Sequence, residues 1–472
     1  MKIEQIYTGC LAQGAYFIES KGEAVVIDPL REVQPYLDKA AQRGVRIRYI
    51  FETHFHADFV SGHLDLAAKT GAVIVYGPTA QPGFEAHVAA DGEVLKLGDV
   101  TFTVLHTPGH TMESTCYLLK DEQGKQLALF TGDTLFIGDV GRPDLAQKVN
   151  AGLTPELLAG HLYHSLREKI MPLDDALIIY PAHGAGSACG KMMSRETTDT
   201  LGHQKATNYA LNPGLTQEAF LQQVLTGLTP PPHYFPFNVM MNIQGYDRFE
   251  EVLKRSLKPL EVPAFEAAAN ETGALILDTR DPQEFAKGFV PNAINIGLHG
   301  SFAPWVGTLI TDIRQPLLLV TEEGLEEETV TRLSRVGYDH TIGYLKGGFA
   351  AWKSAGKEYD SIPSITAAAL AALVQKQDAP IIDVRRKSEY DAEHLVQARN
   401  APLDTINESM LLVDKQVPVY IHCASGYRSM IFASILKARG YDNLIEVQGG
   451  YKALKDSGRF PTTTYVRPLT EL

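Results

Sequence analysis

The sequence predicts a multidomain protein of mixed α/β and α+β structure, and three observations lead to this prediction. The chain has 472 residues, which is long for a single hydrophobic core and favours about three domains. In the first half, short apolar runs that are typical of strands end repeatedly in histidine or aspartate. In the second half, one pattern of strands, helices and turns occurs twice, which indicates two related domains.

The composition is that of an ordinary globular protein and disfavours several functions. Hydrophobic residues make up 44% and charged residues 21% of the chain. The formal net charge of −13 gives no support for binding nucleic acid or an anionic membrane. Because the first residues lack the order of a signal peptide and no apolar run is long enough to span a bilayer, we expect a cytoplasmic protein. Four cysteines without a Cys-x-x-Cys pair indicate neither a disulfide framework nor a thiolate zinc site.

Local patterns place the first structural elements. Residues 47–51 are typical of a buried strand, and residues 64–70 have the spacing of a helix. That helix is expected to stop at Gly71, because glycine adopts the left-handed conformation that ends many helices. A polar helix is expected to begin at Lys191, and the proline-rich residues 229–236 interrupt regular structure.

Side chains that commonly bind metals follow the strand at residues 47–51. Two imidazoles and a carboxylate occupy alternate positions, which places them on one face where the strand ends: His54, His56 and Asp58. Three later strands end in glycine-flanked loops that carry further ligand types: His110, Asp133 and His183. Because strand ends are where distant parts of a chain converge, the sequence predicts a metal site built from these loops.

This order of motifs resembles the metallo-β-lactamase superfamily over the whole first domain, which we place at residues 1–258. The resemblance implies an αββα sandwich with the site at one edge of the sheets. In hydrolytic members, such as the glyoxalase II thioesterases, two metals are held and a histidine follows the aspartate of the motif. Here that position is Phe59, which has no donor atom, so we expect one metal.

Within the superfamily, three motifs are most similar to those of persulfide dioxygenases: Thr107-Pro-Gly-His110-Thr111, Thr131-Gly-Asp133-Thr134-Leu-Phe136 and Gly141-Arg142-Pro-Asp144. The resemblance implies one Fe²⁺ per chain on His54, His110 and Asp133, a facial set that leaves positions open for substrate sulfur and dioxygen. The remaining polar residues are then expected to orient ligands or line the substrate pocket: His56, Asp58, His183 and Arg142. The ligand types alone do not choose iron over zinc, so the metal identity depends on the resemblance.

Cys189 has two open interpretations. It lies in a glycine-rich stretch after His183, where the loop can pass close to a ligand and a thiol could take up or present sulfur, a catalytic role. The alternative is a small, half-buried cysteine in a turn. Cys116 and Cys10 have the pattern of core residues, and the lone His106 is expected to be structural.

The repeat predicts two small parallel-sheet domains at residues 259–360 and 361–472. Ala274-Leu-Ile-Leu-Asp278-Thr-Arg280 matches Pro380-Ile-Ile-Asp383-Val-Arg385, and Gly347-Gly-Phe-Ala-Ala matches Gly449-Gly-Tyr-Lys-Ala. The two copies differ in the loop that follows the central strand. The first copy has Thr321 followed by glutamates, so we expect a structural spacer or docking platform.

The second copy carries a nucleophile in this loop, which reads Cys423-Ala-Ser-Gly426-Tyr-Arg428-Ser429. A cysteine between a strand and a helix lies among backbone N–H groups near the positive helix end, which stabilises a thiolate or an anionic persulfide. The loop resembles the Cys-x-x-Gly-x-Arg loop of the rhodanese family. The resemblance implies that Cys423 and Arg428 are catalytic and that the other loop residues bind persulfide: Ala424, Ser425, Gly426, Tyr427 and Ser429.

The whole chain resembles fused persulfide dioxygenase–rhodanese proteins. The resemblance implies that a low-molecular-weight thiol persulfide is oxidised by O2 to sulfite and thiol, and that Cys423 transfers sulfane sulfur to sulfite to give thiosulfate. It also implies a homo-oligomer. Two alternatives stay open: a glyoxalase II-like zinc thioester hydrolase fused to a rhodanese sulfurtransferase, and a non-catalytic sulfur carrier or sensor.

Overall fold

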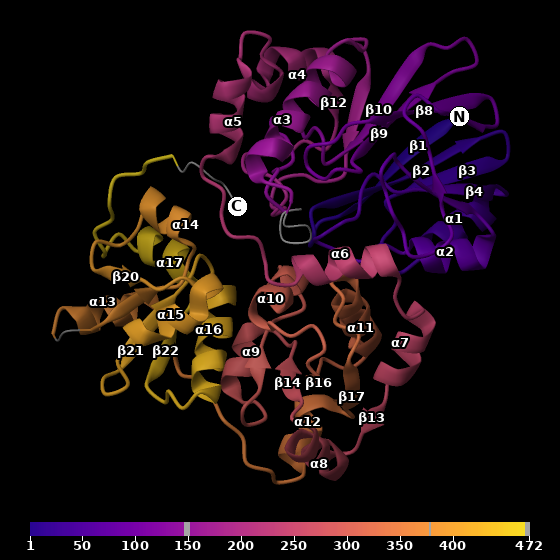
Figure 1. Cartoon of the computed structure of the whole chain (residues 1–472). Helices are drawn as coiled ribbons and strands as arrows, with labels where there is room; N and C mark the ends of the chain where they lie inside the picture. The colour runs from indigo at the N-terminus through magenta and orange to yellow at the C-terminus, as the bar shows by residue number, and fades with distance from the viewer. Residues whose placement is uncertain (146–151, 377–378, 468–472) are drawn as a thin grey trace. The chain divides into compact units, whose positions relative to one another are not determined.

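A computed structural model describes residues 1–145, 152–376 and 379–467 of the chain (Figure 1). The chain forms two compact units, the first made of residues 1–249 and the second of most of the residues that follow. In the described part of the chain, no helix combines the length and the apolar character that a bilayer crossing requires.

The first unit contains two six-stranded sheets. One has the order β1-β2-β3-β4-β5-β6 and contains β1 (Lys2–Thr8), β2 (Gln13–Ser20), β3 (Glu23–Ile27), β4 (Arg46–Phe51), β5 (Val73–Tyr76) and β6 (His87–Val88). The other has the order β12-β11-β10-β9-β8-β7 and contains β7 (Val94–Leu97), β8 (Val100–His106), β9 (Thr115–Lys120), β10 (Gln126–Gly132), β11 (Ile178–Pro181) and β12 (Asp199–Thr200). Both sheets are mixed, because β3, β4, β5 and β6 run parallel and β10 runs parallel to β11, whereas the other pairs are antiparallel.

Helices cover the outer face of each sheet (Figure 1): α1 (Gln34–Arg43), α2 (His63–Thr70), α3 (Pro155–Ser165), α4 (Leu201–Thr207), α5 (Gln217–Leu225) and α6 (Phe235–Gln244). Strand β2 shows why the layers form, because its side chains alternate between two apolar environments. Ala15 and Phe17 pack with Tyr36 of α1. Tyr16 and Ile18 pack in the core that the two sheets share. The expected αββα sandwich is therefore confirmed.

Most local predictions for this unit hold, and one is wrong. The strand expected at residues 47–51 is β4, and α2 ends at Gly71, whose φ of 68° is left-handed. The helix expected from Lys191 begins instead at Leu201. The segment at Lys191 is a loop held by a distant side chain, because the backbone N–H groups of Lys191 and Met192 both donate to Asp139 Oδ2 at 2.7 Å.

The second unit contains two five-stranded parallel sheets with the same strand order. The sheet of the middle module has the order β13-β17-β16-β14-β15 and contains β13 (Pro259–Leu260), β14 (Leu275–Asp278), β15 (Ile294–Asn295), β16 (Leu317–Val320) and β17 (Thr341–Leu345). The sheet of the last module has the order β18-β22-β21-β19-β20 and contains β18 (Ser364–Ile365), β19 (Ile381–Asp383), β20 (Ala398–Asn400), β21 (Val419–His422) and β22 (Leu444–Val447). The two predicted parallel-sheet domains are confirmed by this repeated order.

Helices connect the strands of both modules. The middle module has α8 (Val262–Thr272), α9 (Pro282–Lys287), α10 (Phe302–Leu309), α11 (Glu326–Arg335) and α12 (Gly348–Ser354), and α7 (Phe249–Ser256) precedes it. The last module has α13 (Ala367–Val374), α14 (Lys387–Ala392), α15 (Ile406–Ser409), α16 (Tyr427–Ala438) and α17 (Gly450–Asp456).

The Asp-x-Arg motif of the repeat forms the same hydrogen-bonded cage in both modules. Arg280 Nη2 donates to Asp278 Oδ2 at 2.6 Å and to the carbonyl of Gly288 at 2.9 Å. Arg385 makes the same two bonds, to Asp383 Oδ2 at 2.6 Å and to a backbone carbonyl at 2.9 Å. The motif therefore fixes the end of the central sheet in each module.

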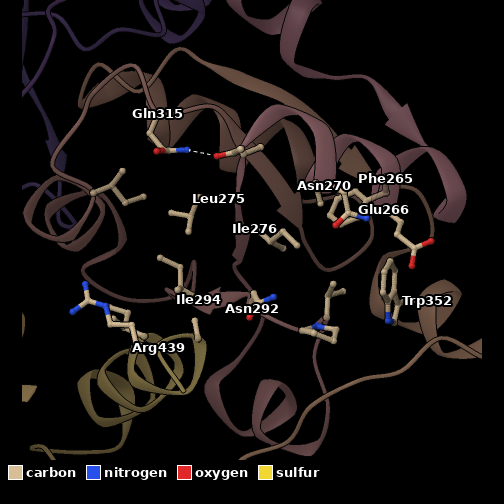
Figure 2. A pocket seen from close by; sticks show the side chains of 18 of the residues that line it. Phe265, Glu266, Asn270, Leu275, Ile276, Asn292, Ile294, Gln315, Trp352 and Arg439 are labelled. Atoms are coloured by element: carbon tan, nitrogen blue, oxygen red, sulfur yellow. Dashed lines mark hydrogen bonds between the residues drawn. The ribbon is translucent and has the colours of Figure 1, made fainter. Parts of the chain in front are cut away.

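An open cavity of about 880 Å³ lies where the two modules meet (Figure 2). Two of its polar lining residues are bonded to protein groups. The amide of Gln315 donates to the carbonyl of Gly273 at 3.0 Å, and the guanidinium of Arg439 donates to Asn407 Oδ1 at 2.9 Å. Cys423 does not line this cavity.

The core between the two large sheets gives a stability prediction. Phe51 is fully buried and stacks on Tyr117, with ring centroids 4.4 Å apart. We expect Phe51→Ala to lower the free energy of unfolding of the first unit by about 3–5 kcal/mol, because the lost ring leaves a cavity. Pulse proteolysis in urea, with peptides of β4 and β9 followed by mass spectrometry, measures this loss.

The matched control is Val73→Ala, because Val73 lies on the same sheet with 46% of its surface exposed. We expect its effect to stay within about 0.5 kcal/mol. Equal effects of the two substitutions would contradict the assigned core.

Candidate functional site

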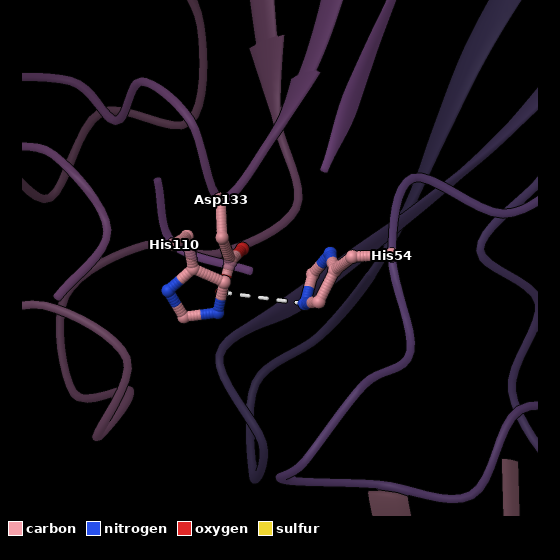
Figure 3. Close-up of side chains that lie close together, drawn as sticks. All are labelled: His54, His110 and Asp133. Carbon is pink, nitrogen blue, oxygen red and sulfur yellow. Dashed lines mark ion pairs between the residues drawn. The ribbon is translucent and has the colours of Figure 1, made fainter. Parts of the chain in front are cut away.

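Three strand-end loops bring the predicted metal ligands together (Figure 3). His54 follows β4, His110 follows β8 and Asp133 follows β10, so both sheets contribute. One donor atom from each residue lies within 4.8 Å of the others. All three side chains are at most 1% exposed. The structure thus assembles one candidate metal centre from residues 79 positions apart in the chain.

Hydrogen bonds orient both imidazoles toward the centre. Nδ1 of His110 lies 2.9 Å from the carbonyl oxygen of Arg142, which can only accept, so this nitrogen carries the proton. Its Nε2 is then a free lone pair, 3.4 Å from Asp133 Oδ2. Such a backbone partner fixes the tautomer of many metal-binding histidines.

His54 is oriented by a buried relay. The hydroxyl of Thr53 donates to Asp28 Oδ2 at 2.9 Å, and Nδ1 of His54 lies 3.0 Å from the same hydroxyl oxygen. The hydroxyl proton is thereby committed to Asp28, so Nδ1 of His54 is the donor in its own contact. Nε2 of His54 then carries no proton, and its lone pair faces Asp133.

The site fits a cation. Nε2 of His54 and Oδ2 of Asp133 are buried and have no hydrogen-bond partner, an arrangement that is costly unless an ion binds them. Burial and the neighbouring His56 hold the pKa of His54 well below its usual value, so its lone pair is available. Burial alone would raise the pKa of Asp133, but the imidazoles of His183, His54 and His110 hold it far below the ordinary range. Two imidazoles and one carboxylate suit Fe²⁺ or Zn²⁺.

His56 groups with two carboxylates instead of with this cluster. Its Nε2 lies 3.0 Å from Asp28 Oδ1 and 3.7 Å from Glu52 Oε2. The fully buried ring of Phe59 packs on the imidazole, with centroids 4.3 Å apart. The side chain that packs on His56 therefore has no donor atom, and the supporting role of His56 stays a prediction.

His183 connects the cluster to Asp58. Its Nδ1 lies 2.7 Å from Asp133 Oδ1 and its Nε2 lies 2.8 Å from Asp58 Oδ2. Burial alone would lower the pKa of His183, but the charges of these two carboxylates raise it well above its usual value. The two carboxylates thus favour the imidazolium form of His183, which is hydrogen-bonded to Asp133 through Nδ1 and ion-paired with Asp58 through Nε2. His183 thereby fixes which oxygen of Asp133 faces the candidate metal.

Cys189 lies in a second group with Asp58 and His183, and it is 1% exposed. Burial, with the charges of Asp58 and Asp133, raises the pKa of its thiol well above the ordinary value. Because the thiolate is the nucleophilic form, Cys189 in this structure is a neutral thiol beside the centre.

Arg142 is bound to the protein through its guanidinium. Nε and Nη2 donate to the two carboxylate oxygens of Asp144 at 2.7 Å, and Nη1 donates to the carbonyl of Ala188 at 3.3 Å. Its backbone N–H donates to the carbonyl of Cys189 at 2.9 Å. Arg142 thus holds the loops of His110 and Cys189 together.

Two supporting residues were not found in the sequence. The amide of Asn242 on α6 donates to the carbonyls of His56 and Phe59, both at 2.8 Å, and its oxygen accepts from Ser61 N–H at 2.9 Å. No local pattern marks Asn242. Asp28 does have a signal, because it directly follows strand β3, as other site residues follow theirs.

The last module places Cys423 between β21 and α16, with 1% of its surface exposed. The N–H of Gly426 donates to Cys423 Sγ at 3.1 Å, beside the first turn of the twelve-residue α16. Gly450 has a φ of 57°, and a Cβ there would lie 2.5 Å from the Cys423 carbonyl oxygen. The Cys423 loop therefore packs against Gly450, where a side chain would not fit, and a backbone N–H group donates to the sulfur.

Arg428 forms an ion pair with Glu389, and Nη2 of Arg428 lies 2.8 Å from Glu389 Oε1. Burial alone would raise the pKa of Glu389, but the hydrogen bond and charge of Arg428 hold it below its usual value. In this structure the positive charge of the Arg428 guanidinium is thus paired with the carboxylate of Glu389.

The middle module keeps the backbone of this loop without its nucleophile. Thr321 follows β16 and is 3% exposed. A Cβ on Gly348 would lie 3.0 Å from the Thr321 carbonyl oxygen, as one on Gly450 would meet that of Cys423. The helix that follows this loop is α11, the counterpart of α16 in the last module, and its first turn consists of three glutamates.

Comparison with known proteins agrees with this architecture. The family model described as "Metallo-beta-lactamase superfamily" matches residues 8–183. A crystal structure of a metallo-β-lactamase from Staphylococcus aureus subsp. aureus COL has a TM-score of 0.64 and 30% identity, and covers 73% of this chain and 98% of that chain. A probable hydroxyacylglutathione hydrolase of Schizosaccharomyces pombe is 30% identical over 204 residues, 42% of this chain and 74% of that protein.

The chain belongs to the metallo-β-lactamase superfamily.

This superfamily member also carries two rhodanese-like domains, since the model described as "Rhodanese-like domain" matches residues 262–355 and 366–457. The human mitochondrial persulfide dioxygenase ETHE1 is 30% identical over 226 residues, 47% of this chain and 79% of that protein. Several other hydroxyacylglutathione hydrolases are 33–36% identical, and the chain spans 57–66% of their length. The superfamily domain therefore resembles both kinds of enzyme at similar identity.

From the geometry of the metal centre we predict that the chain binds a single ion and that this binding depends on His110. We expect about one ion per chain from the three converging donors, and a fall below roughly a tenth of that in His110→Ala. Plasma mass spectrometry of protein purified without oxygen measures the metal and identifies it.

The matched control is His106→Gln. His106 precedes the same loop, and its Nε2 lies 2.8 Å from the carbonyl oxygen of Met112. We expect this variant to keep its metal. Two ions per chain in the unaltered protein would contradict the assignment.

Proposed function

We propose that this protein is a non-haem iron persulfide dioxygenase coupled to a sulfurtransferase. Residues 1–258 oxidise a small thiol persulfide, residues 259–360 form an inactive rhodanese-like domain, and residues 361–472 transfer sulfur. The observation that carries the proposal is a buried cluster of only two imidazoles and one carboxylate, with Phe59 where a further ligand would be needed. A cysteine loop on the same chain supplies the second activity.

The oxidation is balanced by dioxygen and water. One persulfide RSSH, one O2 and one H2O give RSH, sulfite and two protons. The terminal sulfur is oxidised by four electrons, which dioxygen accepts, and the bond between the two sulfur atoms breaks. Fe²⁺ bound by His54, His110 and Asp133 would supply the open coordination positions at which sulfur and dioxygen meet.

The surrounding residues prepare this site. The carbonyl of Arg142 and the hydroxyl of Thr53 hold the two imidazoles in the ligating tautomer. The His183 imidazolium binds Asp133 Oδ1 and leaves Oδ2 for the metal. We also propose that the thiol of Cys189, which lies beside Asp58 and His183, contacts the substrate sulfur.

Sulfur transfer then takes place in two steps at Cys423. Its sulfur attacks the terminal sulfur of a second persulfide, a new S–S bond forms to Cys423, and the thiol leaves with the proton. Sulfite next attacks this bound sulfur, the bond to Cys423 breaks, and thiosulfate leaves. The N–H of Gly426 and the N-terminus of α16 stabilise negative charge on the sulfur throughout. The small molecules required are a thiol persulfide, O2 and sulfite.

A second candidate is a glyoxalase II-like zinc thioester hydrolase fused to a sulfurtransferase. It is favoured by relatives named hydroxyacylglutathione hydrolase, at an identity similar to that of the persulfide dioxygenase. This candidate requires zinc, consumes no dioxygen and cleaves a glutathione thioester. Metal analysis and an oxygen electrode distinguish the two.

The division of labour predicts a change of product in Cys423→Ser. With glutathione persulfide and iron-loaded protein, we expect unchanged dioxygen uptake and a fall in thiosulfate of at least roughly a hundredfold, because serine is a poor sulfur acceptor. Sulfite should accumulate instead. An oxygen electrode and ion chromatography measure the three quantities.

His110→Ala is the reciprocal variant and should lose dioxygen uptake while it still forms thiosulfate from added sulfite. Dioxygen uptake that persists in this variant, or thiosulfate that persists in Cys423→Ser, would overturn the proposal. Thioester cleavage without dioxygen uptake in the unaltered protein would favour the hydrolase.

A further inference from the structure

A side chain of the catalytic loop is seated in the module that lacks a nucleophile. The hydroxyl of Tyr427, one residue before Arg428, donates to the carbonyl of Gly297 in the middle module at 2.7 Å. A Cβ at Gly300 would lie 2.6 Å from the Tyr427 ring, and one at Gly297 would lie 3.3 Å from it. Glycine at both positions thus leaves room for the ring. We call the Gly297–Gly300 segment the tyrosine seat.

A second contact reaches the loop through a buried carboxylate. The amide of Gln283 on α9 donates to Glu446 Oε2 at 3.3 Å. The other oxygen of Glu446 lies 3.2 Å from the hydroxyl of Ser429, and that hydroxyl lies 3.6 Å from Cys423 Sγ. A line of polar atoms therefore runs from the middle module to the nucleophile.

Glu446 depends on its neighbours because none of its surface is exposed. Burial raises its pKa, and the hydrogen bonds from Gln283 and Ser429 act in the opposite direction. When a buried carboxyl group loses a hydrogen-bond donor, one of its oxygens is left without a partner and without water, which is unfavourable in free energy. The side chain is therefore expected to move or repack. Because Ser429 and Gly426 both lie against Glu446, such a movement would reach the loop that holds Cys423.

The seat itself is fixed by backbone carbonyls just at and after the end of β14. The amide of Asn295 donates to the carbonyls of Asp278 and Arg280 at 3.1 and 3.0 Å, and Leu298 N–H donates to the carbonyl of Thr279 at 2.9 Å. These bonds hold the segment from β15 to the tyrosine seat against the end of β14. The strand end of the middle module therefore supports the tyrosine seat although no nucleophile stands beside it.

Helix α16 presents one face to this module along its length. Tyr427 and Ser434 are seven residues apart, which places them on the same side of a helix. The hydroxyl of Ser434 accepts from Asn295 N–H at 2.9 Å, and Lys437 Nζ lies 3.4 Å from Asp360 Oδ1. The contacts begin at the N-terminal turn of α16, where charge on sulfur is stabilised.

We propose that the middle module is a positioning element for sulfur transfer, in which Gln283 and the tyrosine seat hold the Cys423 loop in its reactive geometry. Gln283 is a positioning residue, because it acts through Glu446 and Ser429. The inference depends on the proposed sulfur transfer by Cys423 and adds a role for the module that has lost its own nucleophile. Loops displaced by about 1 Å are known to slow reactions by roughly a hundredfold, so modest losses of contact are measurable.

Two substitutions in the full-length protein test the proposal. Gln283→Leu removes the amide donor at similar volume, and Tyr427→Phe removes only the hydroxyl. With glutathione persulfide and sulfite, we expect each to lower kcat for thiosulfate formation roughly tenfold, with KM for sulfite changed less than about twofold. Iodoacetamide labelling of the Cys423 peptide, followed by mass spectrometry, should slow in parallel.

The matched control is Lys287→Met on the same helix, because Lys287 is largely exposed and pairs with Glu284. We expect its kcat to match that of the unaltered protein. Amide hydrogen exchange of α16 distinguishes a loss of positioning from detachment of the two modules. If only positioning is lost, the last two turns of α16 should keep their protection from exchange.

The outcomes distinguish this inference from the proposed function. Unchanged kcat in both Gln283→Leu and Tyr427→Phe, while Cys423→Ser abolishes transfer, would overturn the positioning role alone. A lowered kcat with full loss of α16 protection in both variants would also overturn it, in favour of simple docking. Absence of transfer in the unaltered protein would overturn both.

Discussion

The carboxylate of Asp133 is the group on which the candidate metal centre depends. One of its oxygens is held by the His183 imidazolium, so the other is left facing His54 and His110. Its backbone is equally constrained, because a Cβ on Gly141 would lie 1.9 Å from the Asp133 carbonyl oxygen. Both sheets therefore meet at a residue that can neither rotate nor shift without losing a buried partner.

In the second unit, the residues that support the fold are distinct from the residue that is expected to react. Both modules keep the Asp-x-Arg cage and the strand order, whereas only the last one has a cysteine in its loop. In both modules the cage satisfies buried carbonyl and carboxylate groups, whose burial without partners would be costly. The nucleophile is a single side chain at the end of that scaffold, so it can be lost without loss of the fold.

Much of the fold could be predicted from the sequence because the relevant signals are local. Alternating apolar residues marked the strands, and the ligand types stood directly after them, so the convergence of these polar residues followed from one rule about strand ends. The choice of His54, His110 and Asp133 among them came from the resemblance to persulfide dioxygenases. The segment at Lys191, where a helix was expected, is a loop held by Asp139, which lies 52 residues earlier in the chain. Asn242 and Gln283 act on partners 183 and 163 residues away, and no local pattern carries such information. The roles of the site residues in the reaction stay predictions.

The packing of Phe59 on His56 has a consequence for how this site could have diverged. Replacing the ring with an imidazole would not by itself recreate a two-ion centre, because His183 would have to give up two carboxylate partners and its positive charge. The intermediate would hold one more cationic or polar group among buried residues without an ion to balance it. In this chain, a second ion beside Asp58 would thus require coupled changes at Phe59 and around His183.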